Sequence, residues 1–428
     1  MPRRAANKNE ENTSSDWKAG RFSEANPLKA DVLIAGGGLV GGTLACALAM
    51  GGFRVAVVDS QDPKEGLDAE FDGRASAIAL SSKRVLDGLG LWAHIEPDAG
   101  PIGDIRVSDG DSLFFLHYDH KDIGDEAFGY MVENRTLRRA LAERFTSLDN
   151  IALLAPARVK DLDRTPGQVR ATLEDGRCIE AGLIVGAEGR NSPTRDAAGI
   201  KLTRWSYHQT GIVCTVAHEH SHENIAHEHF LPAGPFAILP LPGNRASIVW
   251  TEKSDLAPAI MALDNDGFLS ELKTRFGDFL GDIEVVGPRW AYPLSLQYAG
   301  RATDQRLVLV GDASHGMHPI AGQGLNMGLR DVAALAEVMT DARRLGLDPG
   351  DGVILDQYER WRRFDNTLML AMTDFLNRLF SNDIEPVRLA RDLGMAAVNK
   401  IPPLKKVFMR HAMGLAGDLP RLMRGETL

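Results

Sequence analysis

The distribution of apolar and polar positions divides the chain into a loose start and an ordered body. The first 27 residues are polar and aperiodic and lack the apolar core of a secretory signal, so we expect a disordered tail over 1–27. Beyond it, an apolar β-branched run at 30–35 is followed by a glycine turn, an Ala/Leu-rich helical stretch and a second apolar run at 55–58. This order predicts a βαβ unit.

Two further apolar runs are typical of buried strands. The run at 183–187 follows a hairpin signal at 175–176 and ends at an acid and a glycine. The run at 307–310 leads into a glycine-rich loop and then into an amphipathic helix. Apolar positions at helical spacing over 78–89 predict another helix.

Composition narrows the classes of function. The 428 residues carry 58 acidic against 48 basic side chains, and a net charge of −10 without a Lys/Arg stripe is a poor match for nucleic acid. Three scattered cysteines are too few for a disulfide framework or a zinc cage, which favours a reducing, cytoplasmic location and leaves redox chemistry to a cofactor. No apolar run reaches the roughly 18 residues of a membrane-spanning helix, so we expect none.

The glycine turn of the βαβ unit fits the G-x-G-x-x-G pattern at Gly36, Gly38 and Gly41. Gly36 permits the tight turn, Gly38 lets backbone approach a pyrophosphate, and Gly41 allows close packing of helix on strand. The phosphates would lie at the helix N-terminus, where unpaired N–H groups favour negative charge. Asp59 ends the second strand, where a carboxylate accepts hydrogen bonds from a ribose. The pattern predicts dinucleotide binding without separating NAD from FAD.

The loop after 307–310 favours the flavin. Asp312 follows the strand directly, where it can accept hydrogen bonds from sugar-like hydroxyls, and the loop then feeds a helix N-terminus. The partial positive charge of that terminus would stabilise a reduced flavin ring. Glu188 and Gly189 lie at the carboxyl edge of the same predicted sheet, with a simple tight turn as the alternative.

Two segments carry a resemblance to a known family. His318–Asp331, HPIAGQGLNMGLRD, resembles the signature of ubiquinone-biosynthesis hydroxylases within the para-hydroxybenzoate hydroxylase type of flavoproteins, and Tyr130–Leu141 is similar to their ENxxLxxAL segment. The likeness covers roughly residues 30–420. It implies an α/β fold with a Rossmann-like FAD-binding domain, interleaved with a mostly antiparallel β-sheet substrate domain and followed by a C-terminal helical segment. The expected boundaries are 28–100, 128–202 and 303–345 for the FAD-binding domain, 101–127 and 203–302 for the substrate domain, and 346–428 for the C-terminal helices.

Carried over position by position, the resemblance implies a cofactor site. The adenosine diphosphate would be held by Gly36, Gly38, Gly41 and Asp59, and the FAD would be touched by Arg74 and Asn134. Asp312 would bind ribityl or ribose hydroxyls. The pyrimidine edge of the isoalloxazine would lie beside Gly324 and Asn326. Arg135 could share the contact of Asn134, since relatives outside this family often have arginine at the latter position. Glu188 stands where the family has aspartate, which moves the carboxylate by one methylene.

The resemblance also implies the chemistry. The flavin is reduced by NAD(P)H or by a separate redox protein, reacts with dioxygen to give a C4a-hydroperoxide, and transfers one oxygen atom to a phenol. The protein orients the ring and excludes water, and no metal is needed. The sequence identifies no catalytic side chain. The candidate pocket walls, for which core packing is the alternative, are Phe236, Leu239, Tyr292 and Pro319.

Five histidines between positions 218 and 229 test the expectation of no metal. His218, His220 and His222 alternate, as do His227 and His229, so each set would share one face of a strand. A metal site is one interpretation. An exposed polar face of the substrate-domain sheet is the interpretation that we favour.

The family's substrate is a polyprenylated phenol on the way to ubiquinone, with a tail that partitions into membrane. The basic segment 388–428 follows apolar positions at 375–380 and could contact an anionic membrane surface, such as the inner membrane, or a partner in a ubiquinone-biosynthesis complex. A solvated helix packed on the core is the alternative. Two other functions stay open, namely a hydroxylase of a small soluble aromatic and a non-catalytic FAD-containing scaffold.

Overall fold

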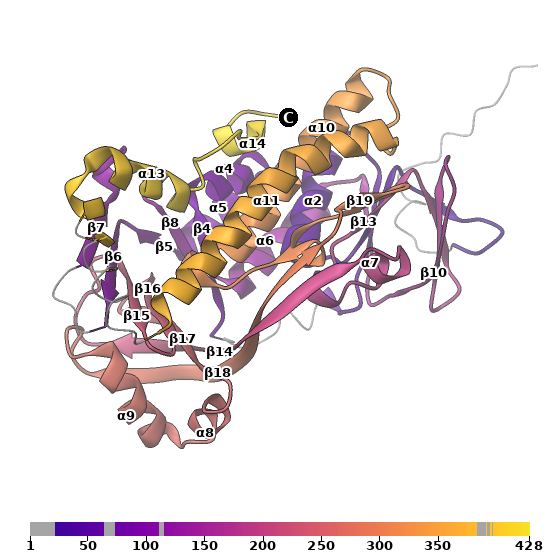
Figure 1. The fold of residues 1–428 in the computed structure, drawn as a ribbon. Coiled ribbons are helices and arrows are strands. Elements are labelled where there is room, and N and C mark those ends of the chain that lie inside the picture. Colours follow the sequence, from indigo (N-terminus) through magenta and orange to yellow (C-terminus); the bar gives the residue numbers. More distant parts are fainter. Residues whose placement is uncertain (1–21, 64–72, 111–114, 383–390, 392–393, 396) are drawn as a thin grey trace, which may run out of the picture.

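A computed structural model of the chain describes residues 22–63, 73–110, 115–382, 391, 394–395 and 397–428 (Figure 1). Most of the expected tail, residues 1–21, lies outside this range. The described residues form four sheets, and helices cover their faces. Segments far apart in the sequence lie in the same layer, because the chain passes several times between the nucleotide-binding part and the large antiparallel sheet.

A six-stranded sheet forms the centre of the nucleotide-binding part, and five of its strands run parallel. Its order is β19 (Thr303–Asp304), β20 (Leu307–Leu309), β13 (Leu183–Gly186), β2 (Val32–Ala35), β3 (Val55–Val58) and β9 (Ile151–Leu154). Its four central strands are buried along their whole length, as expected for a parallel sheet covered on both faces. Helix α2 (Leu39–Met50) connects β2 to β3, so the predicted βαβ unit is confirmed.

Different layers cover the two faces of this sheet. Helices α2 and α10 (Gln323–Arg344) pack on one face. On the other lies a small sheet in the order β1 (Leu28–Lys29), β12 (Cys178–Ala181), β11 (Val169–Leu173) and β10 (Val159–Arg164). The predicted hairpin signal is confirmed, since Gly176 turns between β11 and β12 with a φ of 84°.

A three-stranded sheet extends the nucleotide-binding part. It contains β4 (Ala75–Ala79), β8 (Gly129–Glu133) and β5 (Ala99–Ile102), and the helices around it are α4 (Leu80–Gly88), α5 (Trp92–Ile95) and α6 (Asn134–Ser147). The predicted helix over 78–89 begins two residues too early, because Ile78 pairs with Tyr130 in the β4–β8 ladder. A buried strand residue just before an amphipathic helix mimics helical spacing.

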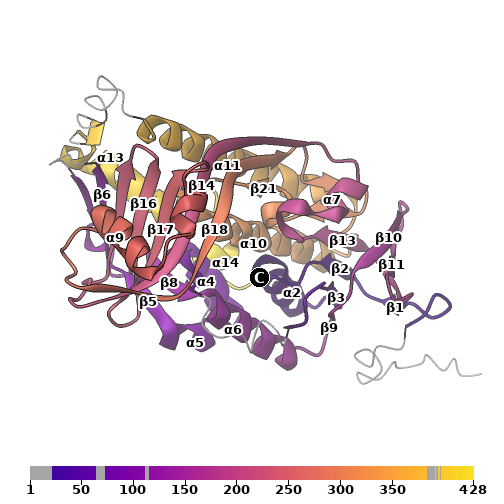
Figure 2. The ribbon, with the colours of Figure 1, turned by 90° about the horizontal axis from the view of Figure 1, so that it is seen from below.

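An eight-stranded sheet forms the second part of the molecule. Its order is β21 (His315–Gly316), β18 (Ile283–Ala299), β14 (Leu202–His218), β17 (Arg245–Lys253), β16 (Gly234–Leu241), β15 (Ile225–Leu231), β6 (Asp104–Asp109) and β7 (Phe115–Asp119). All neighbours are antiparallel except β15 and β6. Helices α8 (Ala257–Met261) and α9 (Asn265–Phe276) cover one face, which we call the outer face (Figure 2).

The opposite, inner face of this sheet is turned toward the nucleotide-binding part. The Thr215 hydroxyl donates to the Gly73 carbonyl at 3.3 Å, and the Arg74 guanidinium lies 5.1 Å from the centre of the Trp290 ring. The long helix α11 (Gly352–Phe380) runs from the nucleotide-binding part to this sheet (Figure 1). Further helices are α7 (Pro193–Ala197), α13 (Pro402–Ala412) and α14 (Arg421–Arg424), and among the described residues no helix is long and apolar enough to cross a bilayer.

Candidate active site

Four loops predicted to carry chemistry meet at the carboxyl edge of the parallel sheet. Gly36 follows β2, Asp59 follows β3, Glu188 follows β13, and Asp312 follows β20. Backbone hydrogen bonds continue the ladder into these loops, for instance from the Gly36 amide to the Val58 carbonyl at 2.8 Å. Ligands of open parallel sheets bind at this edge, so the structure brings the predicted nucleotide-binding residues together where a ligand is expected.

The glycine turn leaves the start of α2 open. A Cβ atom on Gly38 would meet no atom within 4 Å, whereas one on Gly41 would lie 1.9 Å from the Gly36 carbonyl oxygen. Gly38 is also the N-cap residue, and no side chain caps the helix. Among the described residues, the space beside Gly38 at this N-terminus is therefore open, and the unpaired N–H groups of a first helical turn suit a phosphate.

The two aspartates differ in their surroundings. Asp59 accepts hydrogen bonds from the amides of Gly37 and Gln61 at 2.5 and 2.8 Å, which fix it beside the glycine turn. The Asp312 carboxylate receives no side-chain or backbone hydrogen bond from the part of the chain that the structure describes. Burial raises its pKa, although Arg190 and His315 oppose the rise. Hydroxyl donors of a ligand would satisfy this carboxylate.

The loop before α10 combines an open position with a fixed one. A Cβ atom on Gly324 would meet nothing within 4 Å, which leaves room at the N-terminus of this helix. The Asn326 amide is engaged, since it accepts from the Ala79 amide at 2.9 Å and donates to the carbonyls of Ala77 and Gly322 at 2.9 and 3.0 Å. Its side chain thus fastens β4 to the loop, and its predicted place beside a flavin ring stays a prediction.

Arg74 and Asn134 are neighbours at the end of the three-stranded sheet. The Asn134 amide donates to the Arg74 carbonyl at 2.9 Å, and the Ser76 hydroxyl donates to the Asn134 side-chain oxygen at 2.7 Å. Arg135, the alternative, pairs with Glu133 at 2.6 Å. The FAD contacts of Arg74 and Asn134 stay predictions.

Glu188 is turned into its own loop. Its carboxylate accepts hydrogen bonds from the Ser192 hydroxyl, from the Thr194 hydroxyl at 2.6 Å and from the Thr194 amide at 3.3 Å. Burial raises the pKa of this group, and these hydrogen bonds oppose the rise. The carboxylate, with its extra methylene relative to aspartate, is thus hydrogen-bonded within the turn before α7.

Side chains along β16 alternate between the two faces of the sheet, and this places two of the pocket candidates on opposite faces. Phe236 is fully buried in the outer-face core with Trp250 and Phe268, so it is a core residue and not a wall of an inner-face pocket. Leu239 points to the inner face, where it packs near Ala75 and Ala77 of β4. Tyr292 is 40% exposed opposite Gly211 on the inner face, and Pro319 is half-buried just before Gly322 and α10.

Sequence reasoning missed a buried ionic network behind the Asp312 loop. Asp331 of α10 accepts from the Gly311 amide at 2.9 Å, from His315 Nε2 at 2.6 Å and from Arg362 Nε at 2.7 Å. Its only sequence signal was its place at the end of the signature segment. The buried His318 was missed as well. Both of its ring nitrogens lack hydrogen-bond partners among the described residues, and burial lowers its pKa to about 4.

The clustered histidines do not form an exposed polar face, which corrects our expectation. His218 ends β14, and His227 and His229 lie on the outer face of β15 with their rings 5.8 Å apart. His218 and His227 are buried, and burial lowers the pKa of His227 to about 4. His220 and His222 lie in the turn after β14, so strand alternation does not apply to them.

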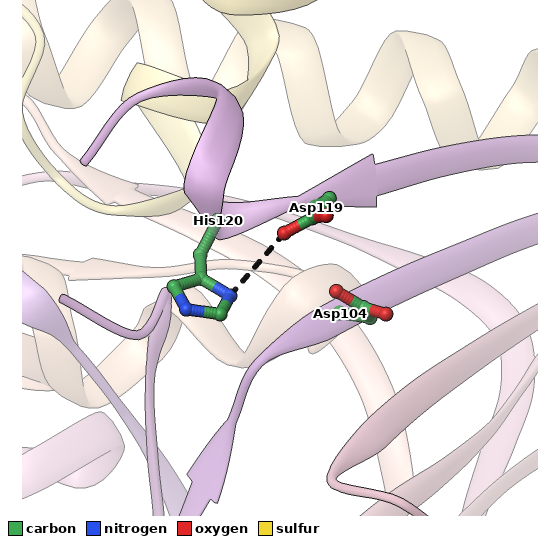
Figure 3. A group of neighbouring side chains, drawn as sticks. All are labelled: Asp104, Asp119 and His120. Carbon is green, nitrogen blue, oxygen red and sulfur yellow. Dashed lines mark ion pairs between the residues drawn. The ribbon is translucent and has the colours of Figure 1, made fainter. Parts of the chain in front are cut away.

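One other group of potential metal ligands lies at the edge of the large sheet. Asp104, Asp119 and His120 have ligand atoms within 4.8 Å of one another (Figure 3). These atoms already have protein partners, because Asp119 caps the Lys121 amide at 2.9 Å and His120 Nδ1 bonds to the Gly103 carbonyl at 2.8 Å. We therefore assign no metal to this group.

Comparison with known proteins identifies the family. A family model described as an FAD binding domain matches residues 29–370. Ubiquinone hydroxylase UbiL of Rhodospirillum rubrum is 58% identical over 402 residues, covering 93% of this chain and 94% of that protein. The chain belongs to the FAD-dependent monooxygenases of ubiquinone biosynthesis. The 3-demethoxyubiquinol 3-hydroxylase of Escherichia coli is 33% identical over 387 residues, covering 90% of this monooxygenase and 98% of that protein.

A solved structure shows that the fold is shared. The p-nitrophenol 4-monooxygenase PnpA from Pseudomonas putida DLL-E4 has a TM-score of 0.75 at 19% identity, and the match covers 91% of this chain and 99% of that chain. The predicted α/β fold with a Rossmann-like FAD-binding part and an antiparallel sheet is confirmed. FAD is the cofactor of the family, and the open N-termini of α2 and α10 fit it, as does the Asp312 carboxylate, which has no hydrogen-bond donor among the described residues.

The two glycines of the first turn provide a matched pair of variants. Gly38→Val is expected to leave the fold intact and to weaken FAD binding by about tenfold or more, because its side chain fills the space open to the pyrophosphate. Gly41→Ala is expected to destabilise the protein by about 1–3 kcal/mol through overlap with the Gly36 carbonyl. Chemical denaturation of the FAD-free protein and FAD titration measure both. Equal effects of the two changes would contradict this geometry.

Proposed function

We propose that the monooxygenase hydroxylates the ring of a polyprenylated phenol in ubiquinone biosynthesis, with NAD(P)H or a redox protein as the electron donor. The observation that carries the proposal is the 58% identity to a ubiquinone hydroxylase over nearly the whole of both chains. Bound FAD supplies oxygen activation and electron transfer. The residues of this chain bind the cofactor at the sheet edge and place the inner face of the antiparallel sheet opposite it.

The division of work between the residues follows from their positions. The first turn of α2 holds the pyrophosphate, and Asp59 and Asp312 hold the sugar hydroxyls. Asn326 fixes the loop before α10 to β4, which keeps the open N-terminus of this helix in place. Leu239 and Tyr292 line the inner face, where apolar side chains exclude water from the reacting ring.

A hydroxylase of a small soluble aromatic is the alternative activity. A comparison of kcat/KM for a prenylated phenol and for the same ring without the prenyl chain separates the two. We expect the prenylated ring to be favoured by at least about tenfold, since each buried CH₂ contributes about 0.8 kcal/mol. A preference for the ring without the chain would favour the alternative. Quinone intermediates that accumulate in a strain lacking the protein would then identify the step.

The basic C-terminal segment is partly used inside the protein. Arg391 forms a buried ion pair with Asp109 at 2.7 Å, and Lys405, Arg421 and Arg424 pair with acidic neighbours. Arg388 lies outside the described residues. Of the apolar positions at 375–380, Phe375 is exposed, whereas Leu376, Leu379 and Phe380 pack on the large sheet.

Helix α13 supports contact with an anionic membrane. Four apolar side chains at its start and along it are 36–51% exposed, namely Ile401, Leu404, Val407 and Phe408. Lys400, Lys406 and Arg410 are exposed beside them. An apolar strip flanked by basic residues suits insertion among anionic headgroups, which would bring the site to a substrate dissolved in lipid. A partner within a ubiquinone-biosynthesis complex is the competing occupant.

Substitution on this strip tests the membrane contact. Val407→Glu is expected to reduce cosedimentation with vesicles containing phosphatidylglycerol by about tenfold, because an apolar contact of about 1.5 kcal/mol is replaced by a like charge. Leu347→Glu is the control, since Leu347 is also 50% exposed but lies between α10 and α11. Equal binding of both variants and the unmodified protein would remove the membrane proposal.

A further inference from the structure

Glu228 lies at the middle of β15 and points to the inner face of the eight-stranded sheet. The residues on either side of it, His227 and His229, point to the outer face, where His227 contacts Phe279. In the strand ladders, Glu228 pairs with Ala237 of β16 and with Val107 of β6. It is the acidic residue of this strand, and it faces the same side as Leu239 and Tyr292.

Two apolar clusters flank this carboxylate. Ala226, two residues before it, belongs to a cluster with Leu239 of β16 and Ala77 of β4. Phe230, two residues after it, stacks on Phe380 of α11 with ring centres 4.1 Å apart. Glu228 thus lies in an apolar part of the inner face, on the side of the sheet that faces the cofactor-binding part.

Strand β4 contacts both this apolar cluster and the loop at the start of α10. The Ala77 carbonyl accepts from the Asn326 amide at 2.9 Å, and a Cβ atom on Gly322 would lie 2.9 Å from the Ala77 methyl group. The cluster that contains Ala226 and Leu239 therefore borders the loop at the start of α10. Glu228 lies two positions beyond Ala226 on the same face of β15, and therefore next to this cluster.

Among the residues that the structure describes, none compensates the charge of Glu228. Within the described residues its carboxylate forms no hydrogen bond and no ion pair, and burial alone raises its pKa to about 7. The other ionisable groups on this face include Tyr118, whose pKa burial raises to about 12, the Asp109–Arg391 pair, Arg245 with its partner Glu133, and the exposed Tyr292. By accessible surface the residue is half-buried and not fully enclosed. An uncompensated carboxylate costs folding free energy, which is typical of a group retained for function.

We propose that Glu228 is a catalytic residue that accepts the phenolic proton of the substrate. This inference rests on the proposed function and adds the residue that activates the ring. The substrate O–H bond breaks, an O–H bond forms on Glu228, and the electron pair that stays on the ring oxygen increases electron density at the ring carbons. A base that titrates near the working pH is suited to this step.

The remaining atoms and electrons balance with the co-substrates of the reaction. Dioxygen supplies one oxygen atom to the ring carbon, and the second is reduced by the two electrons of reduced nicotinamide, takes up two protons and leaves as water. The hydrogen of the attacked ring carbon leaves as a proton. Glu228 then returns its proton to the ring oxygen, which restores the aromatic hydroxyl and the carboxylate.

Ligand binding without turnover tests this role. A short-chain prenylphenol and its methyl ether are titrated by calorimetry into the FAD-loaded, oxidised protein between pH 6 and 8. A protonated Glu228 can donate to either ligand, whereas its carboxylate accepts a hydrogen bond from the phenol alone. We expect the preference for the phenol over the ether to rise by about tenfold across this range and to lose its pH dependence in Glu228→Gln.

Two further variants and one activity profile complete the test. Glu228→Asp is expected to restore part of the pH dependence, and Glu284→Gln, an exposed change in the same sheet, to leave it unaltered. The rise of kcat/KM with pH near 7 is expected to disappear in Glu228→Gln, with kcat reduced by about 100-fold or more. If the unmodified protein discriminates the two ligands and Glu228→Gln keeps the same pH dependence, the role of Glu228 is wrong. If the unmodified protein binds neither ligand, the proposed function itself fails.

Discussion

Replacing Asp312 by alanine is expected to weaken FAD binding by about 2–3 kcal/mol, a factor of roughly 30–150 in the dissociation constant. The reason is that this carboxylate has no hydrogen-bond donor among the described residues, so its partners must come from the ligand. The ratio of flavin to protein absorbance after gel filtration, together with an FAD titration, measures the loss. The FAD-free variant is expected to be at least as stable as the FAD-free original, because a buried charge has been removed.

The histidine cluster supplies the controls for this experiment. His220→Ala and His229→Ala change residues of the large sheet and its turn that lie outside the cofactor edge, and both variants should retain FAD. Asp312→Asn keeps an acceptor oxygen and should bind FAD with intermediate affinity. Unchanged FAD occupancy in Asp312→Ala would remove Asp312 from the cofactor site.

Replacing Asp331 by alanine is expected to destabilise the protein by about 3–5 kcal/mol, the largest effect on stability that we predict. Asp331 and Arg362 are both buried, and the change leaves the guanidinium and His315 without their shared acceptor. The Gly311 amide loses its partner as well, which loosens the loop that carries Asp312. Urea denaturation of the FAD-free protein gives the free energy, and FAD affinity should fall in the same variant.

The pH dependence of stability gives an independent view of this network. Burial alone would raise the pKa of Asp331, but the charges and hydrogen bonds of His315 and Arg362 hold it at about 2, below the ordinary 3.8. A lowered pKa contributes stability above pH 4, and this contribution is lost as the pH falls toward 2. Acid unfolding of Asp331→Asn should lack this contribution. Glu426→Gln, which breaks an exposed pair with Arg424, should change nothing measurable.

Local sequence patterns predicted the elements that short-range physics determines. The βαβ unit and the hairpin at Gly176 depend on glycine conformations and on β-branched runs. The position of the nucleotide-binding residues was also predictable, because the carboxyl ends of parallel strands meet at one side of a sheet. That rule brought Asp59 and Asp312 together although more than 250 residues separate them.

Long-range pairing accounts for what the sequence did not reveal. Asp109 and Arg391 are 282 positions apart, and neither shows in its own segment that the other neutralises it. Phe236 and Leu239 belong to one apolar run, and only the strand register places one in the outer core and the other on the inner face. Glu228 lies between His227 and His229 in the sequence, and strand alternation places its side chain on the opposite face of the sheet from both histidines.

Oxygen incorporation tests the proposed activity most directly. The FAD-loaded protein is given reduced nicotinamide, or a chemically reduced redox partner, with a short-chain prenylphenol under ¹⁸O₂, and the products are analysed by mass spectrometry. We predict a ring-hydroxylated product that carries one ¹⁸O atom and forms in proportion to the reductant consumed. Consumption of reductant with peroxide as the sole product, despite full FAD occupancy and measurable phenol binding, would contradict the account and favour a non-catalytic scaffold.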